Sequence, residues 1–70
     1  MKPISGKEFN RILLRHGWTL LRIQGSHYIF GKADSNVRLS VPMHGNSALK
    51  AGLLNHLIKM AGLTEEEMND

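Results

Sequence analysis

The fold is decided by residues 18–42, whose sequence is WTLLRIQGSHYIFGKADSNVRLSVP. Two runs in this stretch, 18–24 and 27–30, are rich in β-branched and aromatic residues, and the Gly-Ser pair between them is a turn signal. A turn-rich segment follows, and the alternation of apolar and polar residues over 37–41 predicts another strand, which a proline ends. We therefore expect a three-stranded antiparallel meander.

An amphipathic helix is predicted on each side of this meander. On the N-terminal side, Ser5 and Glu8 have the spacing of a capping box, and apolar residues then recur at helical spacing until Gly17. On the C-terminal side, a helical apolar pattern over 54–61 is closed by Gly62. Packing both helices on one face of the sheet would bury both apolar stripes. The predicted fold class is α+β, in the order helix, three strands, helix.

The two outer strands should each place one set of apolar side chains against the helices. On the third strand these are Leu39 and Val41, and on the first strand they are Leu21 and Ile23. The residues between them are mostly polar and are expected to point away from the core. The pattern thus predicts a sheet with one covered face and one open face.

The middle strand allows two registers. If Tyr28 and Phe30 face the core, His27 lies on the open face beside Arg22 and Arg38. That arrangement would gather positive charge and hydrogen-bond donors around an imidazole. The opposite register would bury His27 instead.

Length and composition limit the class of protein. Seventy residues predict a single domain, 1–70, in which 64–70 is either one further helical turn or a flexible acidic tail. The absence of cysteine excludes disulfides and thiolate chemistry and is typical of a reducing compartment, so we expect a cytoplasmic protein. The hydrophobic pattern predicts neither a signal peptide nor a membrane span. The formal net charge of +3 favours a polyanionic partner.

The segment Gly25-Ser26-His27 places a histidine directly after a bend, and it resembles the glycine-serine-histidine motif of HicA toxins. The resemblance continues in HicA order through Gly17-Trp18, Val41-Pro42-Met43-His44, Lys50-Ala51-Gly52-Leu53-Leu54 and Ala61-Gly62-Leu63-Thr64. Ordered agreement over nearly the whole chain is much harder to obtain by chance than any one short string. The resemblance implies a fold like that of double-stranded-RNA-binding domains.

The same resemblance implies the toxin of a type II toxin–antitoxin system. HicA toxins are mRNA interferases, endoribonucleases that a HicB-type antitoxin silences, so the expected partners are mRNA and that antitoxin protein. We expect a monomer that forms a hetero-oligomer with the antitoxin, with no membrane partner and no cofactor. No metal site is expected, since the four histidines lack the spacing of zinc ligands. The alternatives are a non-catalytic RNA-binding module of the same fold and a protein whose basic face meets an acidic protein.

The resemblance assigns catalysis to His27, because an imidazole is able to accept the proton of an RNA 2′-hydroxyl near neutral pH. Gly25 and Ser26 would support it, the glycine by permitting a positive φ and the serine by orienting the imidazole or holding a phosphate. Turn chemistry alone would also explain both residues. His44 is either a second proton-transfer or phosphate-contacting residue, or an ordinary exposed loop histidine.

Basic residues are the candidates for phosphate contacts, because Arg and Lys position a nucleic-acid backbone without reading its sequence. The candidate RNA-binding residues are Arg11, Arg22, Lys32, Arg38, Lys50 and Lys59. Each would be unremarkable as part of a solvated surface. Lys7, Arg11 and Arg15 recur four residues apart, which makes their helix face a candidate contact surface. An exposed Leu14 on that helix would suit a contact with the antitoxin.

Overall fold

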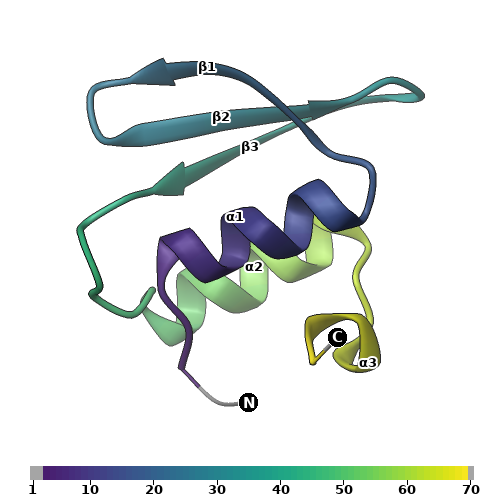
Figure 1. Ribbon diagram of the computed structural model, residues 1–70. Helices are drawn as coiled ribbons and strands as arrows, with labels where there is room; N and C mark the ends of the chain where they lie inside the picture. Colours follow the sequence, from purple (N-terminus) through teal and green to yellow (C-terminus); the bar gives the residue numbers. More distant parts are fainter. Residues whose placement is uncertain (1–2, 70) are drawn as a thin grey trace.

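The computed structural model describes residues 3–69. Its elements are α1 (Gly6–Arg15), β1 (Thr19–Gln24), β2 (His27–Lys32), β3 (Ser35–Pro42), α2 (Ala51–Ala61) and α3 (Glu65–Met68). The sheet is antiparallel with the strand order β1-β2-β3, and both α1 and α2 lie on the same face of it (Figure 1). No described element covers the other face. The predicted α+β fold is confirmed, and the acidic C-terminal segment forms the short helix α3.

The start of α1 follows the predicted capping box. The Ser5 hydroxyl accepts a hydrogen bond from the Glu8 N–H at 3.2 Å, and the Glu8 carboxylate accepts one from the Ser5 N–H at 3.3 Å. A side-chain cap of this kind stabilises a helix by about 1 kcal/mol. The helix is followed by Gly17 at φ +89°, a conformation that favours glycine.

The first residue of α1 packs directly against the end of β3. A Cβ atom on Gly6 would overlap the carbonyl oxygen of Pro42, so this close approach requires glycine. Beside it, an antiparallel bridge joins Ser5 to Ala48 in the loop before α2. The start of α1, the end of β3 and the loop that leads to α2 are therefore joined at one end of the molecule.

The core lies between the helices and the covered face of the sheet. Phe9 and Leu13 from α1 and Phe30, Leu39 and Val41 from the sheet are fully buried. The buried face of α2 consists of Leu54, Leu57, Ile58 and Ala61. Truncating a buried phenylalanine to alanine typically costs about 3–5 kcal/mol, so these contacts dominate the stability of so small a domain. Within residues 3–69, no helix has the length and apolar character needed to cross a bilayer.

The middle strand adopts the register that leaves His27 on the open face. Tyr28 is opposite Val41 and Phe30 is opposite Leu39, and all four belong to the core or pack against it. Successive side chains of a strand point to opposite faces, so His27 points away from the helices, where it is exposed. The first of the two registers considered from the sequence is confirmed.

The prediction that Leu21 and Ile23 face the helices is wrong for Leu21; Ile23 is on the predicted face, opposite Tyr28, but it is not buried. A β-bulge between Leu20 and Arg22 inserts an extra residue into β1, which breaks the simple alternation. Leu20 packs against the core, whereas Leu21 and Ile23 are 47% and 53% exposed. Leu21 instead lies against Gly31, where an added Cβ atom would be 2.7 Å from the Leu21 Cδ1. Ile23 is exposed because β1 is an edge strand.

Candidate functional site

The Gly-Ser-His motif forms the turn between β1 and β2 and the first residue of β2. Gly25 has a φ of +59° and Ser26 does not have a positive φ, which is the pattern of a two-residue type II′ hairpin turn. His27 follows, opposite Gln24 on β1 and Pro42 on β3. The hairpin thus fixes the backbone of His27 between two strands while its side chain stays exposed.

A hydrogen bond ties this turn to the end of β3. The Met43 N–H donates to the Ser26 carbonyl oxygen at 2.7 Å. The loop that carries His44 therefore begins beside the motif. The side chains of Ser26 and His27 are exposed and make no hydrogen bond to another described residue, so both are accessible to a ligand.

A cavity of about 400 Å³ lies between the end of β3 and the start of α2, and we call it the β3–α2 cavity. Its lining consists of Pro42, His44, Ser47, Ala48, Leu49, Lys50 and Leu53. Two predicted site residues, His44 and Lys50, therefore share one cavity. Pro42 links that cavity to His27, which it faces across the β2–β3 pairing. The turn between β1 and β2, the end of β3 and the start of α2 lie at the left of Figure 1.

A second cavity, of about 270 Å³, lies between α1 and the same loop, and we call it the α1 cavity. Its lining consists of Lys7, Asn10, Arg11, Tyr28, Met43 and Gly45. It brings together two of the basic residues that the sequence placed on one helix face, Lys7 and Arg11. Sequence reasoning missed Asn10 and Tyr28, although Asn10 is three residues after Lys7 and so lies beside it on the helix surface. The Asn10 Oδ1 is buried with no hydrogen-bond partner among the described residues.

Arg22 lies on the same open face as His27. It is opposite Ile29, which follows His27 by two residues on β2. Arg22 and His27 are therefore diagonal neighbours, a relation in which Cα atoms are about 7–8 Å apart and long side chains reach one another. The predicted proximity of Arg22 and His27 is confirmed.

Three other candidate RNA-binding residues lie away from His27. The Nζ of Lys32, at the opposite end of β2, is 5.5 Å from the centre of the Trp18 ring. The Arg38 guanidinium donates to two backbone carbonyl oxygens of its own strand, at 3.3 and 3.1 Å. Lys59 is in the last turn of α2, at the end of that helix remote from the cavity. The prediction that Arg38 lies beside His27 is wrong, because the β2–β3 register places Pro42 there.

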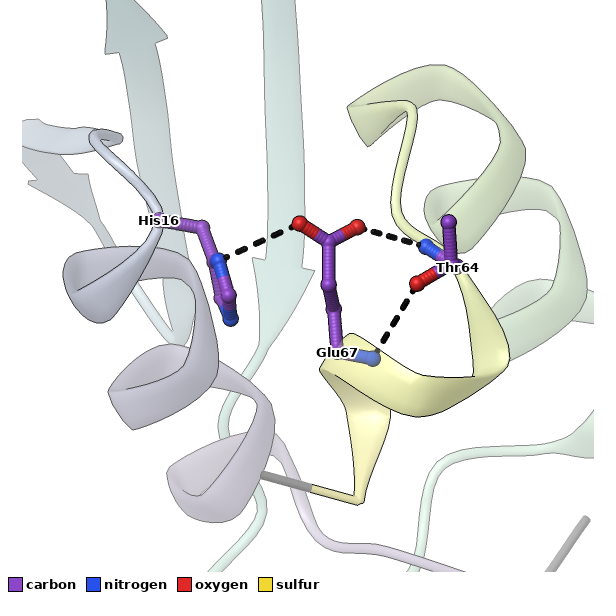
Figure 2. A network of polar contacts seen from close by, with 3 residues as sticks. All are labelled: His16, Thr64 and Glu67. Atoms are coloured by element: carbon purple, nitrogen blue, oxygen red, sulfur yellow. Dashed lines mark hydrogen bonds and ion pairs between the residues drawn. The ribbon is translucent and has the colours of Figure 1, made fainter.

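At the opposite end from the motif, a polar network joins α3 to α1 (Figure 2). The Glu67 carboxylate accepts from the Thr64 N–H at 2.8 Å, and the Thr64 hydroxyl accepts from the Glu67 N–H at 3.1 Å. The other Glu67 oxygen lies 3.5 Å from the His16 Nδ1 at the end of α1. The Thr64 N–H, supported by the Thr64 hydroxyl and by His16, lowers the pKa of Glu67.

In the described part of the chain, neither cavity has an acidic side chain in its lining. Glu8 belongs to the cap of α1, and Glu65, Glu66 and Glu67 belong to α3. Residues 3–69 contain no group of three or more histidine or carboxylate side chains placed to hold a metal ion. The groups that the site offers to a ligand are imidazoles, basic side chains and backbone N–H groups.

Comparison with known proteins identifies the family. The family model described as HicA toxin of bacterial toxin-antitoxin matches residues 6–63, which include the motif and the linings of both cavities. No curated protein matches the chain. Because the match covers most of its length, this chain belongs to the HicA toxin family of toxin–antitoxin systems.

Proposed function

We propose that this HicA toxin is an endoribonuclease that cleaves mRNA, with His27 as its general base. The observation that carries the proposal is the position of His27, which is exposed at the start of β2 and faces Pro42 of the β3–α2 cavity. A backbone held by two strands limits the motion of the imidazole, while basic residues nearby attract a polyanion. Together these features suit proton transfer on bound RNA.

RNA would supply its own nucleophile in this reaction. Neutral His27 takes the proton of a 2′-hydroxyl, and the oxygen attacks the adjacent phosphorus. The bond between that phosphorus and the 5′-oxygen of the next nucleotide breaks, leaving a 2′,3′-cyclic phosphate and a 5′-hydroxyl. A protonated His44, or a water molecule, gives the leaving oxygen its proton. General-base assistance of this kind typically contributes 10²–10⁴-fold.

The start of α2 is a suitable place for a phosphate group. Lys50 is its N-cap, no side chain caps the helix, and no acidic residue lies in its first turn. Free N–H groups and the positive end of the helix dipole favour an anion there. Arg11, with Lys7, would hold a phosphate from the α1 side, and Arg22 would hold one on the open face. Lys32, Arg38 and Lys59 would contact more distant parts of a longer RNA.

A toxin of this family implies an antitoxin, and we propose a HicB-type protein that covers His27. Leu14 offers an apolar anchor for it, since it is 51% exposed between the exposed Arg11 and Arg15 on α1. Exposed apolar side chains rimmed by charge are typical of protein interfaces. In this proposal the toxin is a cytoplasmic monomer that forms a hetero-oligomer with the antitoxin.

The test is cleavage of RNA by the purified protein in EDTA, comparing the wild type with His27→Ala. Circular dichroism first establishes that both are folded. Cleavage that is lost in His27→Ala, with a 2′,3′-cyclic phosphate on the products, supports the proposal. RNA binding without cleavage by either protein would instead favour a non-catalytic RNA-binding module.

A further inference from the structure

The β3–α2 cavity combines an apolar interior with a basic entrance. Leu49 is buried and Leu53 is half-buried, while the polar lining residues His44, Ser47 and Lys50 are all exposed. Its volume of about 400 Å³ lies in the range of cavities that hold small organic groups. The cavity is therefore suited to an apolar group that is attached to an anion.

The charges around the cavity indicate which kind of ligand it binds. No carboxylate lines the cavity, whereas Lys50 contributes a cation and the uncapped start of α2 contributes free N–H groups. A phosphate alone would leave the exposed part of the Leu53 side chain uncovered. An uncharged apolar ligand would not use Lys50. A nucleotide satisfies both, because its base is a flat ring system and its phosphate carries negative charge.

The β3–α2 cavity lies close to the strand position of His27, the proposed general base. Pro42 lines the cavity and is also opposite His27 in the sheet, so the occupant would contact the strand residue that pairs with His27. The Met43 N–H bond to the Ser26 carbonyl oxygen joins the motif to the residue between Pro42 and His44, both of which line the cavity. A base in this cavity would fix the neighbouring phosphate relative to His27.

We propose that the β3–α2 cavity receives one unpaired nucleobase of the RNA next to the bond that is cut. Pro42 and Leu53 pack on the base while Lys50 contacts its phosphate. This inference rests on the proposed endoribonuclease function and extends it to the substrate: a base paired within a duplex is not free to enter, so the RNA is single-stranded at this position.

The first measurement is the affinity of single-stranded oligoribonucleotides for the His27→Ala protein, which binds without cutting, by fluorescence anisotropy. A series of otherwise identical oligoribonucleotides carries one abasic site, moved along the chain. Loss of the base that occupies the cavity is expected to weaken binding about tenfold, within the range of base stacking on a protein surface. Equal affinity for every member of the series would overturn the proposal.

Variants that fill the cavity test whether the affinity lost with the abasic oligoribonucleotides comes from the β3–α2 cavity. In the His27→Ala background, Ala48→Trp and Ser47→Trp fill the cavity from two exposed lining positions. Asn55→Trp is the matched control, because Asn55 is exposed on α2 outside the cavity. Both filling variants should bind the intact oligoribonucleotide about tenfold more weakly than His27→Ala does. Their affinity should not fall further when the abasic oligoribonucleotide replaces the intact one. The control should bind both oligoribonucleotides as His27→Ala does.

The same substitutions in the wild-type background separate this inference from the proposed function. If the wild type cleaves RNA and folded Ala48→Trp and Ser47→Trp cleave it equally well, the base site is wrong and the nuclease stands. If the wild type binds RNA without cleaving it, the nuclease is wrong while the binding series still tests the base site. If the filling variants lose affinity for the antitoxin alone, the occupant is a protein side chain and the base site is overturned.

Discussion

The two ends of this molecule use the same kinds of residue in different ways. The end that contains His16, Lys32 and Glu67 is called the clasp end, and here each of these three side chains contacts another residue of the protein. His16 lies 3.5 Å from the Glu67 carboxylate, and Lys32 lies over the ring of Trp18. Histidine and lysine at this end stabilise the contact between α1, the sheet and α3.

The site end contains the 25–27 turn and residues 42–50. The side chains of His27, His44 and Lys50 are exposed here and form no hydrogen bond or ion pair with another described residue. A group without an internal partner contributes little to folding and is accessible to an anion from outside. The comparison indicates that the role of a basic residue in this toxin follows from the residues around it and not from its residue type.

The largest expected effect separates the histidines at the two ends. His27→Ala should lower the rate of RNA cleavage by about 10²–10⁴-fold, the contribution of a general base, without changing the unfolding temperature. His16→Gln should instead lower the unfolding temperature and leave cleavage within about twofold at a temperature where it is folded. Cleavage assays with matched thermal unfolding curves measure both. A catalytic loss in His16→Gln equal to that in His27→Ala would remove the distinction.

Binding of the antitoxin tests whether partners contact only the site end. Leu14 is exposed near the C-terminal end of α1, away from the site end. If the antitoxin buries it, Leu14→Ser should weaken the complex about tenfold or more, since burying a leucine is worth about 1.5–3 kcal/mol. Calorimetry of toxin with its antitoxin measures this, with Met60→Ser as a control at another exposed apolar residue. Unchanged affinity would confine the interface to the site end.

A smaller effect is expected for the two lysines. Lys50→Ala should weaken RNA binding and reduce the slope of log affinity against log salt by about 1, as for one lost phosphate contact. Lys32→Ala should change that slope less and should lower the free energy of unfolding by about 0.5–1 kcal/mol, the value of an exposed cation–π contact. Salt titrations and denaturant unfolding distinguish them. Equal changes in slope would show that RNA reaches both ends.

The smallest effect is the pH dependence of the clasp end. The pKa of Glu67 is lower in the folded protein, mainly because of the Thr64 N–H, so its ionised form stabilises the fold above the ordinary carboxyl pKa. That contribution is lost as the pH falls through the folded pKa. Glu67→Gln should therefore be less stable than the wild type at pH 7 and nearly equal to it at about pH 2. An unchanged difference between the two pH values would contradict this account.

Local sequence signals predicted the helices well, because each depends on residues that are close in the chain. The capping box of Ser5 and Glu8 and the left-handed Gly62 are examples. The exposed His27 also followed from alternation once Tyr28 and Phe30 were placed in the core. The bulge that exposes Leu21 could not be predicted in this way, because it depends on pairing with the neighbouring strand.

The candidate site was predicted in part. The sequence supplied His27, His44 and Lys50 as separate candidates, and the fold is what places the last two in one cavity next to Pro42. That cavity depends on how the loop after β3 meets α2, a tertiary contact with no local pattern. For Lys32 the sequence predicted a phosphate contact but carried no sign of its packing on Trp18, which is fourteen residues earlier.

The glycine at the start of α1 makes the site sensitive to a change that touches neither its imidazoles nor its cavities. Any side chain at position 6 would clash with the Pro42 carbonyl oxygen and force α1 away from the end of β3. The displaced Pro42 is at once the neighbour of His27 and a wall of the β3–α2 cavity. A genetic selection for variants that fold but have lost toxicity should therefore yield substitutions at Gly6. Such variants would retain every proposed catalytic group.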